Sequence, residues 1–143
     1  MKYDYAPDLK ERLCSIAQTL RMEHINLERV ECLRSFGSST KRTLARCHTI
    51  GKVMQKGMKV SAFYTIEFLE KFDKLSIAEQ DKVIIHELLH IPKTFGGGFR
   101  QHDYVCEENV EKLHLDLQRI NPFSFTKPII NSTKILDFLN FRR

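Results

Sequence analysis

The sequence predicts an α+β domain in which an N-terminal helix precedes a small three-stranded sheet, mainly antiparallel or mixed, and two further helices follow. Three observations support this class. Apolar residues recur at helical spacing near the N-terminus, short β-like runs bounded by turn residues fill the next third of the chain, and helical signals return after Ser76. With 143 residues, 42% hydrophobic and 29% charged, the chain has the size and composition of one globular domain.

The first helix is expected from about Pro7 to Met22. Acidic residues at Asp4 and Asp8 are typical of a helix start. The apolar residues then follow helical spacing at Leu9, Leu13, Ile16, Ala17 and Leu20. This pattern predicts an amphipathic helix with one buried face.

Three strands are expected between the first helix and residue 69. Val30–Phe36 is the first, ended by a Gly-Ser-Ser turn, and Thr43–Ile50 is the second, with Gly51 after it. Ala62–Phe68 is the clearest, because its residues alternate between two faces. The apolar face carries Ala62, Tyr64, Ile66 and Phe68, and the other carries Phe63, Thr65 and Glu67.

Two helices are expected in the second half of the chain. Ser76 and Glu79 form a capping-box pattern, and the helix that they open should end near Ile91 because Pro92 cannot continue it. Residues 93–101 contain three consecutive glycines and should form a loop. The next helix is expected over roughly Val105–Ile120, whose apolar residues form one stripe.

The most informative segment is Val83–Ile91, which is apolar except at His86, Glu87 and His90. A helix that is apolar on nearly all sides is buried, and buried imidazole and carboxylate groups are costly unless they are paired or coordinated. His86 and His90 have i, i+4 spacing, so they lie on one helical face and can both reach one metal ion. Glu87 can lie beside that metal, where a carboxylate accepts a proton from bound water.

The string His86–His90 (HELLH) resembles the active-site helix of the zincin metallopeptidases. A longer pattern is similar to the small metallopeptidases of archaea and phages that are grouped near the SprT-like proteases. It comprises Tyr64–Glu67, His86–Pro92, Gly96–Gly97 and His102. The resemblance covers about Leu27–Ile120.

This resemblance implies a zincin-like minimal catalytic domain over 1–122 that holds one Zn²⁺. It implies that the zinc ligands are His86, His90 and His102 and that Glu87 is the catalytic base. Residues 123–143 are then expected to be a C-terminal tail or a short docking helix.

Reasoning from the residues alone leaves the third ligand open. His102 lies beyond Pro92 and the glycines, in a loop that can bring it back over the helix. Its rivals lie on the next helix, because two His and one Glu bind zinc as well as three His do. They are Glu107, Glu108 and Glu111.

Other polar residues near the motif have weaker claims. Arg100 and Tyr104 flank His102 and could polarise a carbonyl, and Asp103 could accept the free ring N–H of a ligand histidine. The remaining histidines have no partner at ligand spacing, which favours surface or structural roles for His24, His48 and His114.

The motif therefore favours a metal-dependent hydrolase that acts on a peptide or protein substrate. Three protein ligands leave a position on the metal for water, whose pKa falls toward ~7 there. Glu87 would take the proton of that water and pass it to the leaving amine. We expect Ala62–Phe68 to be an edge strand against which an extended peptide pairs.

The basic residues of the chain are concentrated in one segment. Residues 29–60 contain eight Lys and Arg residues but one acid, Glu31, whereas the whole chain has a net charge of +5. Clustered lysine and arginine can contact phosphates, although Phe36 is the segment's one aromatic residue and offers little stacking for bases. The alternative to a peptidase is therefore a non-catalytic, zinc-stabilised module that binds nucleic acid or another partner through 29–60.

Composition also predicts the compartment. No apolar run approaches the ~20 residues that a membrane-spanning helix needs, so no membrane partner is expected. The N-terminus lacks the pattern of a secretory signal, and the cysteines are widely spaced at Cys14, Cys32, Cys47 and Cys106. We therefore expect a cytoplasmic protein with free thiols.

Overall fold

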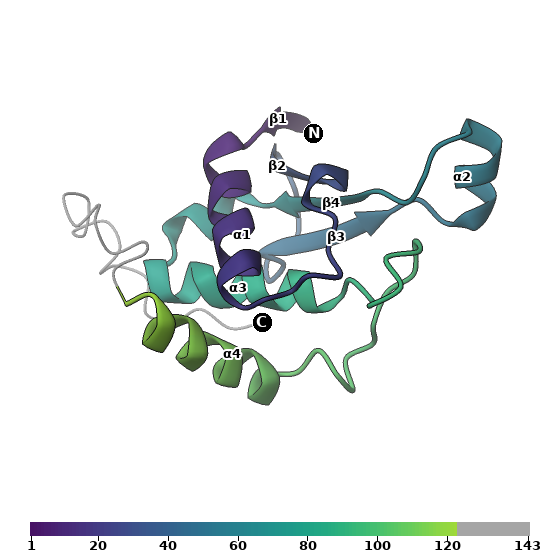
Figure 1. Cartoon of the computed structure of the whole chain (residues 1–143). Coiled ribbons are helices and arrows are strands. Elements are labelled where there is room, and N and C mark those ends of the chain that lie inside the picture. Colours follow the sequence, from purple (N-terminus) through teal and green to yellow (C-terminus); the bar gives the residue numbers. More distant parts are fainter. Residues whose placement is uncertain (123–143) are drawn as a thin grey trace.

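The computed structural model describes residues 1–122, which form a mixed four-stranded sheet with helices packed against it (Figure 1). The predicted α+β class is confirmed, with one strand more than expected. The predicted tail or docking helix, 123–143, lies outside the described residues. The elements are β1 (Lys2–Tyr5), α1 (Pro7–Thr19), β2 (Val30–Phe36), β3 (Ala45–Thr49), α2 (Lys52–Met58), β4 (Tyr64–Phe68), α3 (Ile77–Leu89) and α4 (Glu107–Ile120), with short 3-10 helices at Leu27–Arg29 and Glu70–Lys74.

The strand order is β1-β2-β4-β3, so β4 lies inside the sheet and β1 and β3 form its edges. β2 and β4 are parallel, whereas β1 pairs with β2 and β3 pairs with β4 in antiparallel fashion. The prediction that 62–68 is an edge strand was therefore wrong. Alternation along a strand shows which of its faces is buried, but it does not show how many neighbours the strand has. Of the two edge strands of the sheet, β3 is the one that packs against α3.

The fourth strand, β1, was not predicted. Its four residues, Lys2–Tyr5, are all exposed, so no apolar side chain marks one face of the strand. It is held by antiparallel pairing with the end of β2. Ala6 then donates its backbone N–H to the carbonyl of Cys32, and α1 begins at Pro7, where the missing N–H of proline costs nothing.

α1 ends at Thr19, three residues before the expected end at Met22. Leu20 donates its N–H to the carbonyl of Ile16, and Arg21, with a φ of 55°, donates its N–H to the carbonyl of Gln18. This left-handed backbone reverses the chain after the helix. The apolar pattern continued through Leu20 and gave no warning of the reversal.

The core lies between the sheet and the helices. Register places Cys32, Ala45 and Ile66 on the same face of three neighbouring strands, and all three are buried. α1 and α3 pack against the sheet and α4 packs on both of these helices. On the opposite face Glu67 is 3% exposed, and its carboxylate lies 2.8 Å from the Nε2 of His48.

A polar clamp joins α1 to α3. The Arg12 guanidinium donates to Gln80 and to Asp81, each at 2.6 Å. Burial raises the pKa of the Asp81 carboxyl above its ordinary value, and the neighbouring Arg12 charge opposes that rise. The clamp therefore fixes the first turn of α3 against α1, upstream of the HExxH residues.

Two further sequence expectations concern membrane spans and the cysteines. Within residues 1–122, no helix has the length and apolarity needed to span a bilayer. The four cysteines carry free thiols, as expected. Cys32 is buried in β2, and its burial raises the pKa of the thiol to about 12.

Candidate metal centre

α3 carries two predicted ligands and the predicted base, and its ends are fixed by local sequence. At the start, the Ser76 hydroxyl accepts a hydrogen bond from the N–H of Glu79 at 3.2 Å, which confirms the predicted cap. At the end, His90 is the C-cap and donates its backbone N–H to the carbonyl of Glu87, and Ile91 donates its N–H to the carbonyl of Leu88. The helix thus stops just before Pro92.

Packing fixes the rotation of α3. Its buried residues surround most of the helix, and they include Val83, Ile84, Ile85 and Leu88. A helix packed on so many sides cannot turn about its axis without opening cavities. His86 and His90, which are half-buried, therefore project from the one stripe that the packing leaves accessible.

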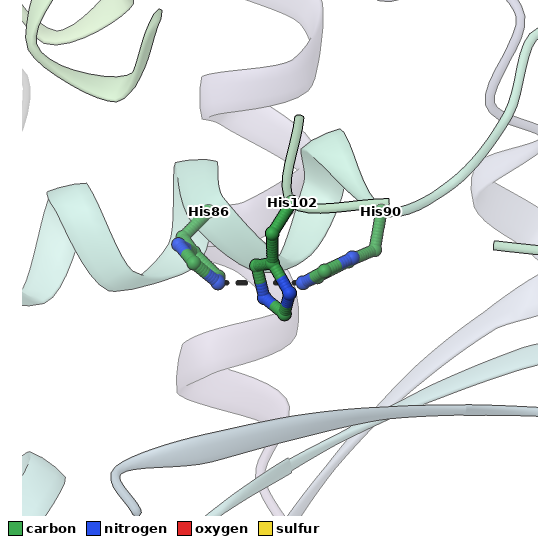
Figure 2. Close-up of side chains that lie close together, drawn as sticks. All are labelled: His86, His90 and His102. Atoms are coloured by element: carbon green, nitrogen blue, oxygen red, sulfur yellow. Dashed lines mark hydrogen bonds between the residues drawn. The ribbon is translucent and has the colours of Figure 1, made fainter. Parts of the chain in front are cut away.

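The imidazoles of His86 and His90 face each other through their Nε2 atoms, which lie 3.3 Å apart (Figure 2). Zinc bound tetrahedrally at about 2.0–2.1 Å from each nitrogen holds its ligand atoms roughly 3.3–3.4 Å from one another. The observed spacing equals that separation. The pair is therefore arranged as two adjacent corners of a tetrahedral metal site.

His90 is held by the segment that returns from the glycine loop. Its Nδ1 lies 2.9 Å from the carbonyl oxygen of Arg100, and its own carbonyl accepts the N–H of Arg100 at 2.8 Å. The first contact assigns the ring proton to Nδ1, because a carbonyl can only accept. Nε2 is then left with its lone pair toward His86, which is the form that binds a metal.

The loop after α3 can follow its path because of Gly97. Its φ is 106°, and a Cβ on this residue would lie 2.6 Å from the carbonyl oxygen of Ile50 and would also overlap the Gln55 side chain. Only glycine combines this backbone conformation with so close an approach. The reversal expected from the triple glycine is thus confirmed.

Two side chains outside the motif hold this loop in place. The Tyr64 hydroxyl donates to the carbonyl of Gly98 at 2.7 Å and accepts the N–H of Gly97 at 3.0 Å. The Gln55 amide donates to the carbonyls of Gly96 and Ile50. A tyrosine on a buried strand face signals a hydroxyl that needs a partner. The contact of the Tyr64 hydroxyl was not predicted, although the position of Tyr64 on a buried strand face indicates one. Nothing in the sequence indicates the contacts of Gln55.

His102 lies at the end of this loop and is brought back over α3 (Figure 2). One ring nitrogen from each of His86, His90 and His102 falls within 4.8 Å of the others. His102 is exposed, so this side of the cluster is open to solvent. The structure therefore brings together the three histidines that the sequence singled out and leaves an approach to them.

Glu87 lies beside this cluster on the buried side of α3, and it is 1% exposed. Burial and then the negative charge of Glu87 raise the pKa of the Cys47 thiol on β3. The carboxylate therefore lies between the histidine helix and the edge strand of the sheet.

Comparison with known protein families finds a match to a model described as "Putative phage metallopeptidase", over residues 1–120. The chain belongs to this family. Comparison with curated proteins and with solved structures finds no match. The matched range spans nearly all of the described residues, and it contains the histidine cluster and Glu87. The family description agrees with a metallopeptidase kind of function.

The rival ligands of this metallopeptidase lie outside the histidine cluster. Glu107 and Glu108 are exposed in the first turn of α4, where carboxylates interact favourably with the helix dipole. Glu111 lies one turn further on and pairs with Lys82 at 2.9 Å. In residues 1–122, the one group of His, Cys, Asp and Glu side chains close enough to share an ion is His86, His90 and His102.

The polar residues around His102 have other contacts. Asp103 accepts the backbone N–H of Tyr104 through Oδ1. The acceptor beside the Nδ1 of His90 is the carbonyl of Arg100. The Arg100 guanidinium lies 3.2 Å from the centre of the Tyr104 ring. A backbone carbonyl leaves no signal in sequence, which is why it was missed.

The other histidines lie outside the cluster, as expected. His24 is within 3.2 Å of the carbonyl of Ile91, and His48 binds Glu67 on the outer face of the sheet. His114 is buried in α4, and that burial lowers the pKa of its imidazole. These contacts support structural roles for His24, His48 and His114.

Proposed function

We propose that the protein is a zinc-dependent peptidase in which His86, His90 and His102 bind one Zn²⁺ and Glu87 is the general base. Family membership supports the metallopeptidase function. The observation that carries the ligand set is the convergence of three imidazoles on one point. The relation to SprT-like proteases and a cytoplasmic location, which free thiols favour, are parts of the same proposal.

The donor set fits zinc. Three imidazoles are a common zinc ligand set, and the spacing of the His86 and His90 nitrogens suits tetrahedral binding. The Nδ1 of His90 is engaged by a carbonyl, as in most metal-binding histidines. Zinc bound here would supply a water of lowered pKa and polarise the scissile carbonyl.

The chain's own residues would carry the proton. Glu87 is next to His86 in sequence and is buried on the same helix, so its position is fixed by α3. In the proposed reaction its carboxylate accepts a proton from water and gives it to the leaving amine. Burial strengthens the interaction of this carboxylate with nearby charge, because water does not screen it.

The substrate would lie on β3. In residues 1–122 the outer side of β3 has no strand beside it, and α3 packs against β3. An extended peptide can add to such an edge through backbone hydrogen bonds. We therefore propose that the substrate pairs with β3 and not with β4, the strand that the sequence analysis expected at the edge.

The test combines metal content with hydrolysis. We expect about one equivalent of zinc per chain in the purified wild type, and none in His86→Ala, because two ligands hold zinc poorly. His48→Ala removes an exposed histidine outside the cluster and is the matched control, which should keep the metal. Glu87→Gln should keep the zinc and lose hydrolysis of an unstructured protein by roughly 100- to 10,000-fold.

Two results would contradict the proposal. Zinc that stays bound in His86→Ala would place the metal elsewhere. A Glu87→Gln protein as active as wild type would remove Glu87 as the base. Folding of each variant is checked by circular dichroism, so that loss of metal is not mistaken for loss of structure.

The alternative is a nucleic-acid-binding module that uses 29–60, and internal contacts of the arginines reduce the number of basic residues available for it. Arg34 binds Asp8 and Asp73, at 2.7 and 2.9 Å. Arg29 donates to the carbonyls of Ser61 and Ala62. Much of the segment's arginine charge is therefore used within the fold, and any nucleic-acid binding would depend mainly on the lysines of α2.

A further inference from the structure

The segment that connects β3 to β4 contains the short helix α2 and differs from the rest of the fold. Residues 50–61, which we call the α2 hairpin, project from the body of the domain (Figure 1). α2 has no buried residue, and Gln55 is its one half-buried side chain. A short helix that buries nothing gains little from packing, so its sequence is free to serve an external contact.

The hairpin carries a row of like charges. Lys52 and Lys56 have i, i+4 spacing, which places them on one side of α2, and Lys59 follows as the left-handed C-cap of the helix, with a φ of 59°. Among the described residues none of the three has an ion-pair partner, and the hairpin contains no acid. Like charges at this spacing destabilise a helix. An anionic partner would relieve that repulsion.

These lysines surround a hollow. Its volume is about 600 Å³, and its lining residues are Lys52, Gln55, Lys56, Lys59, Val60 and Ser61. Three of the six lining residues are lysines, whose apolar stems and Val60 also line the hollow, and it is open to solvent. It therefore suits an anionic group that enters from outside.

The hollow is next to the candidate metal centre. Gln55 of its lining donates to the carbonyl of Gly96, and a Cβ on Gly96 would lie 3.3 Å from the Lys52 ammonium nitrogen. Gly96 belongs to the loop that leads to His102. The hairpin also continues directly from β3, the free edge of the sheet. A chain lying on β3 and running past Thr49 meets the hairpin.

The chemistry of the surface favours a peptide over a nucleic acid. The hairpin has no aromatic residue on which a base could stack, and no arginine that could grip a phosphate with two hydrogen bonds. It does expose apolar side chains beside the lysines: Val53 is 84% exposed, Met54 54% and Met58 53%. Flexible methionine side chains adapt well to peptide side chains.

We infer that the α2 hairpin is a substrate-binding exosite that recognises an acidic segment of the peptide next to the cleaved region. The inference rests on the proposed peptidase function. Each lysine would pair with a substrate carboxylate while Val53, Met54 and Met58 contact apolar side chains between them. Because the pairs are exposed, their contribution falls as salt is added.

The test measures binding separately from catalysis. The probe is a fluorescein-labelled peptide with an apolar half and a glutamate-rich half, compared with the same peptide carrying glutamine in place of glutamate. Zinc-loaded Glu87→Gln protein is titrated into each and anisotropy is recorded. At low salt the acidic peptide should bind about tenfold more tightly, and high salt should remove most of the difference.

The hairpin variant combines Lys52→Glu, Lys56→Glu and Lys59→Glu, and it should lose the preference for the acidic peptide. Its matched control makes the same charge change at exposed lysines elsewhere, with Lys41→Glu, Lys74→Glu and Lys112→Glu. The control should keep the preference, because overall charge is not the cause. Circular dichroism shows that both variants remain folded.

Three outcomes would overturn the exosite: equal binding of the two peptides, a preference that survives in the hairpin variant, or tighter binding of an oligonucleotide of equal charge. The last would make the hairpin a nucleic-acid surface. Hydrolysis of the neutral peptide by wild type tests the peptidase separately. Acid-selective binding without hydrolysis would leave the hairpin as a surface that binds acidic peptides and would contradict the peptidase, whereas hydrolysis without selectivity would keep the peptidase and overturn the exosite.

Discussion

The loop that carries His102 and the α2 hairpin lie against each other, yet they are held in opposite ways. In the loop, Gly97 has no room for a single added carbon, its N–H binds the Tyr64 hydroxyl, and the carbonyls of Gly96 and Gly98 each accept a hydrogen bond from a side chain. In the hairpin, nothing lies within 4 Å of a Cβ added to Gly57. The His102 loop is therefore fixed by close contacts, whereas the main feature of the α2 hairpin is its exposed positive charge.

This difference separates two kinds of functional surface. A metal site needs its ligands within a few tenths of an ångström, and such placement requires packing and hydrogen bonds around each ligand. A surface that attracts an acidic chain needs only enough like charge in one place. Single substitutions should therefore have large effects in the loop and small effects in the hairpin.

The largest expected effect in the loop follows from His102→Ala. Removing a ligand should weaken zinc binding by more than the roughly 10- to 100-fold that loss of an outer hydrogen-bond partner causes. Competition with a chromogenic chelator measures the affinity. Glu111→Gln is the matched control, because Glu111 binds Lys82 and lies outside the cluster. If Glu111→Gln weakened zinc binding and His102→Ala did not, the third ligand would be the glutamate.

The next effect follows from Gly97→Ala. The added methyl would overlap the carbonyl of Ile50 in a backbone conformation that alanine rarely adopts. We expect about 1–3 kcal/mol lower stability in thermal or urea unfolding, together with weaker zinc binding as the loop shifts. Gly98→Ala tests the comparison within the same loop, because nothing lies within 4 Å of its Cβ. Equal losses in both variants would show that the close contact is not the cause.

The smallest expected effect is a gain. Gly57→Ala fills open space in the last turn of α2, and alanine is favoured over glycine by up to about 1 kcal/mol in an exposed helix. Backbone amide exchange in the hairpin should slow while zinc content and hydrolysis stay unchanged. A loss of zinc in Gly57→Ala would mean that the hairpin and the metal centre are not separable in this way.

The parts of the fold that sequence predicted are those with a repeating apolar pattern. β2 was placed at its observed bounds, and α3 was placed within two residues because Ser76 and Pro92 mark its ends. β4 was recognised from alternation. In each of these elements, burial on one side leaves a regular trace in the residue order.

The unpredicted parts lack such a trace. β1 exposes all its residues, α2 buries none, and the neighbours of β4 depend on pairings between distant segments. For the site, HExxH spacing was enough to single out His86, Glu87 and His90, whereas the residues alone left the third ligand open between His102 and the glutamates of the next helix. The hydrogen bonds that position these side chains could not be predicted from the sequence. The carbonyl of Arg100 and the Gln55 amide come close to their partners only in the folded chain.

The Tyr64 hydroxyl has a thermodynamic consequence. It joins the inner strand of the sheet to the loop that presents His102, so the geometry that binds metal exists only when that strand is in place. Any ion that binds the folded chain and not the unfolded one stabilises the fold in proportion to the logarithm of its concentration. The free energy of unfolding would therefore rise with metal concentration, and the Tyr64 hydroxyl is one of the contacts that join the fold to the metal-binding loop.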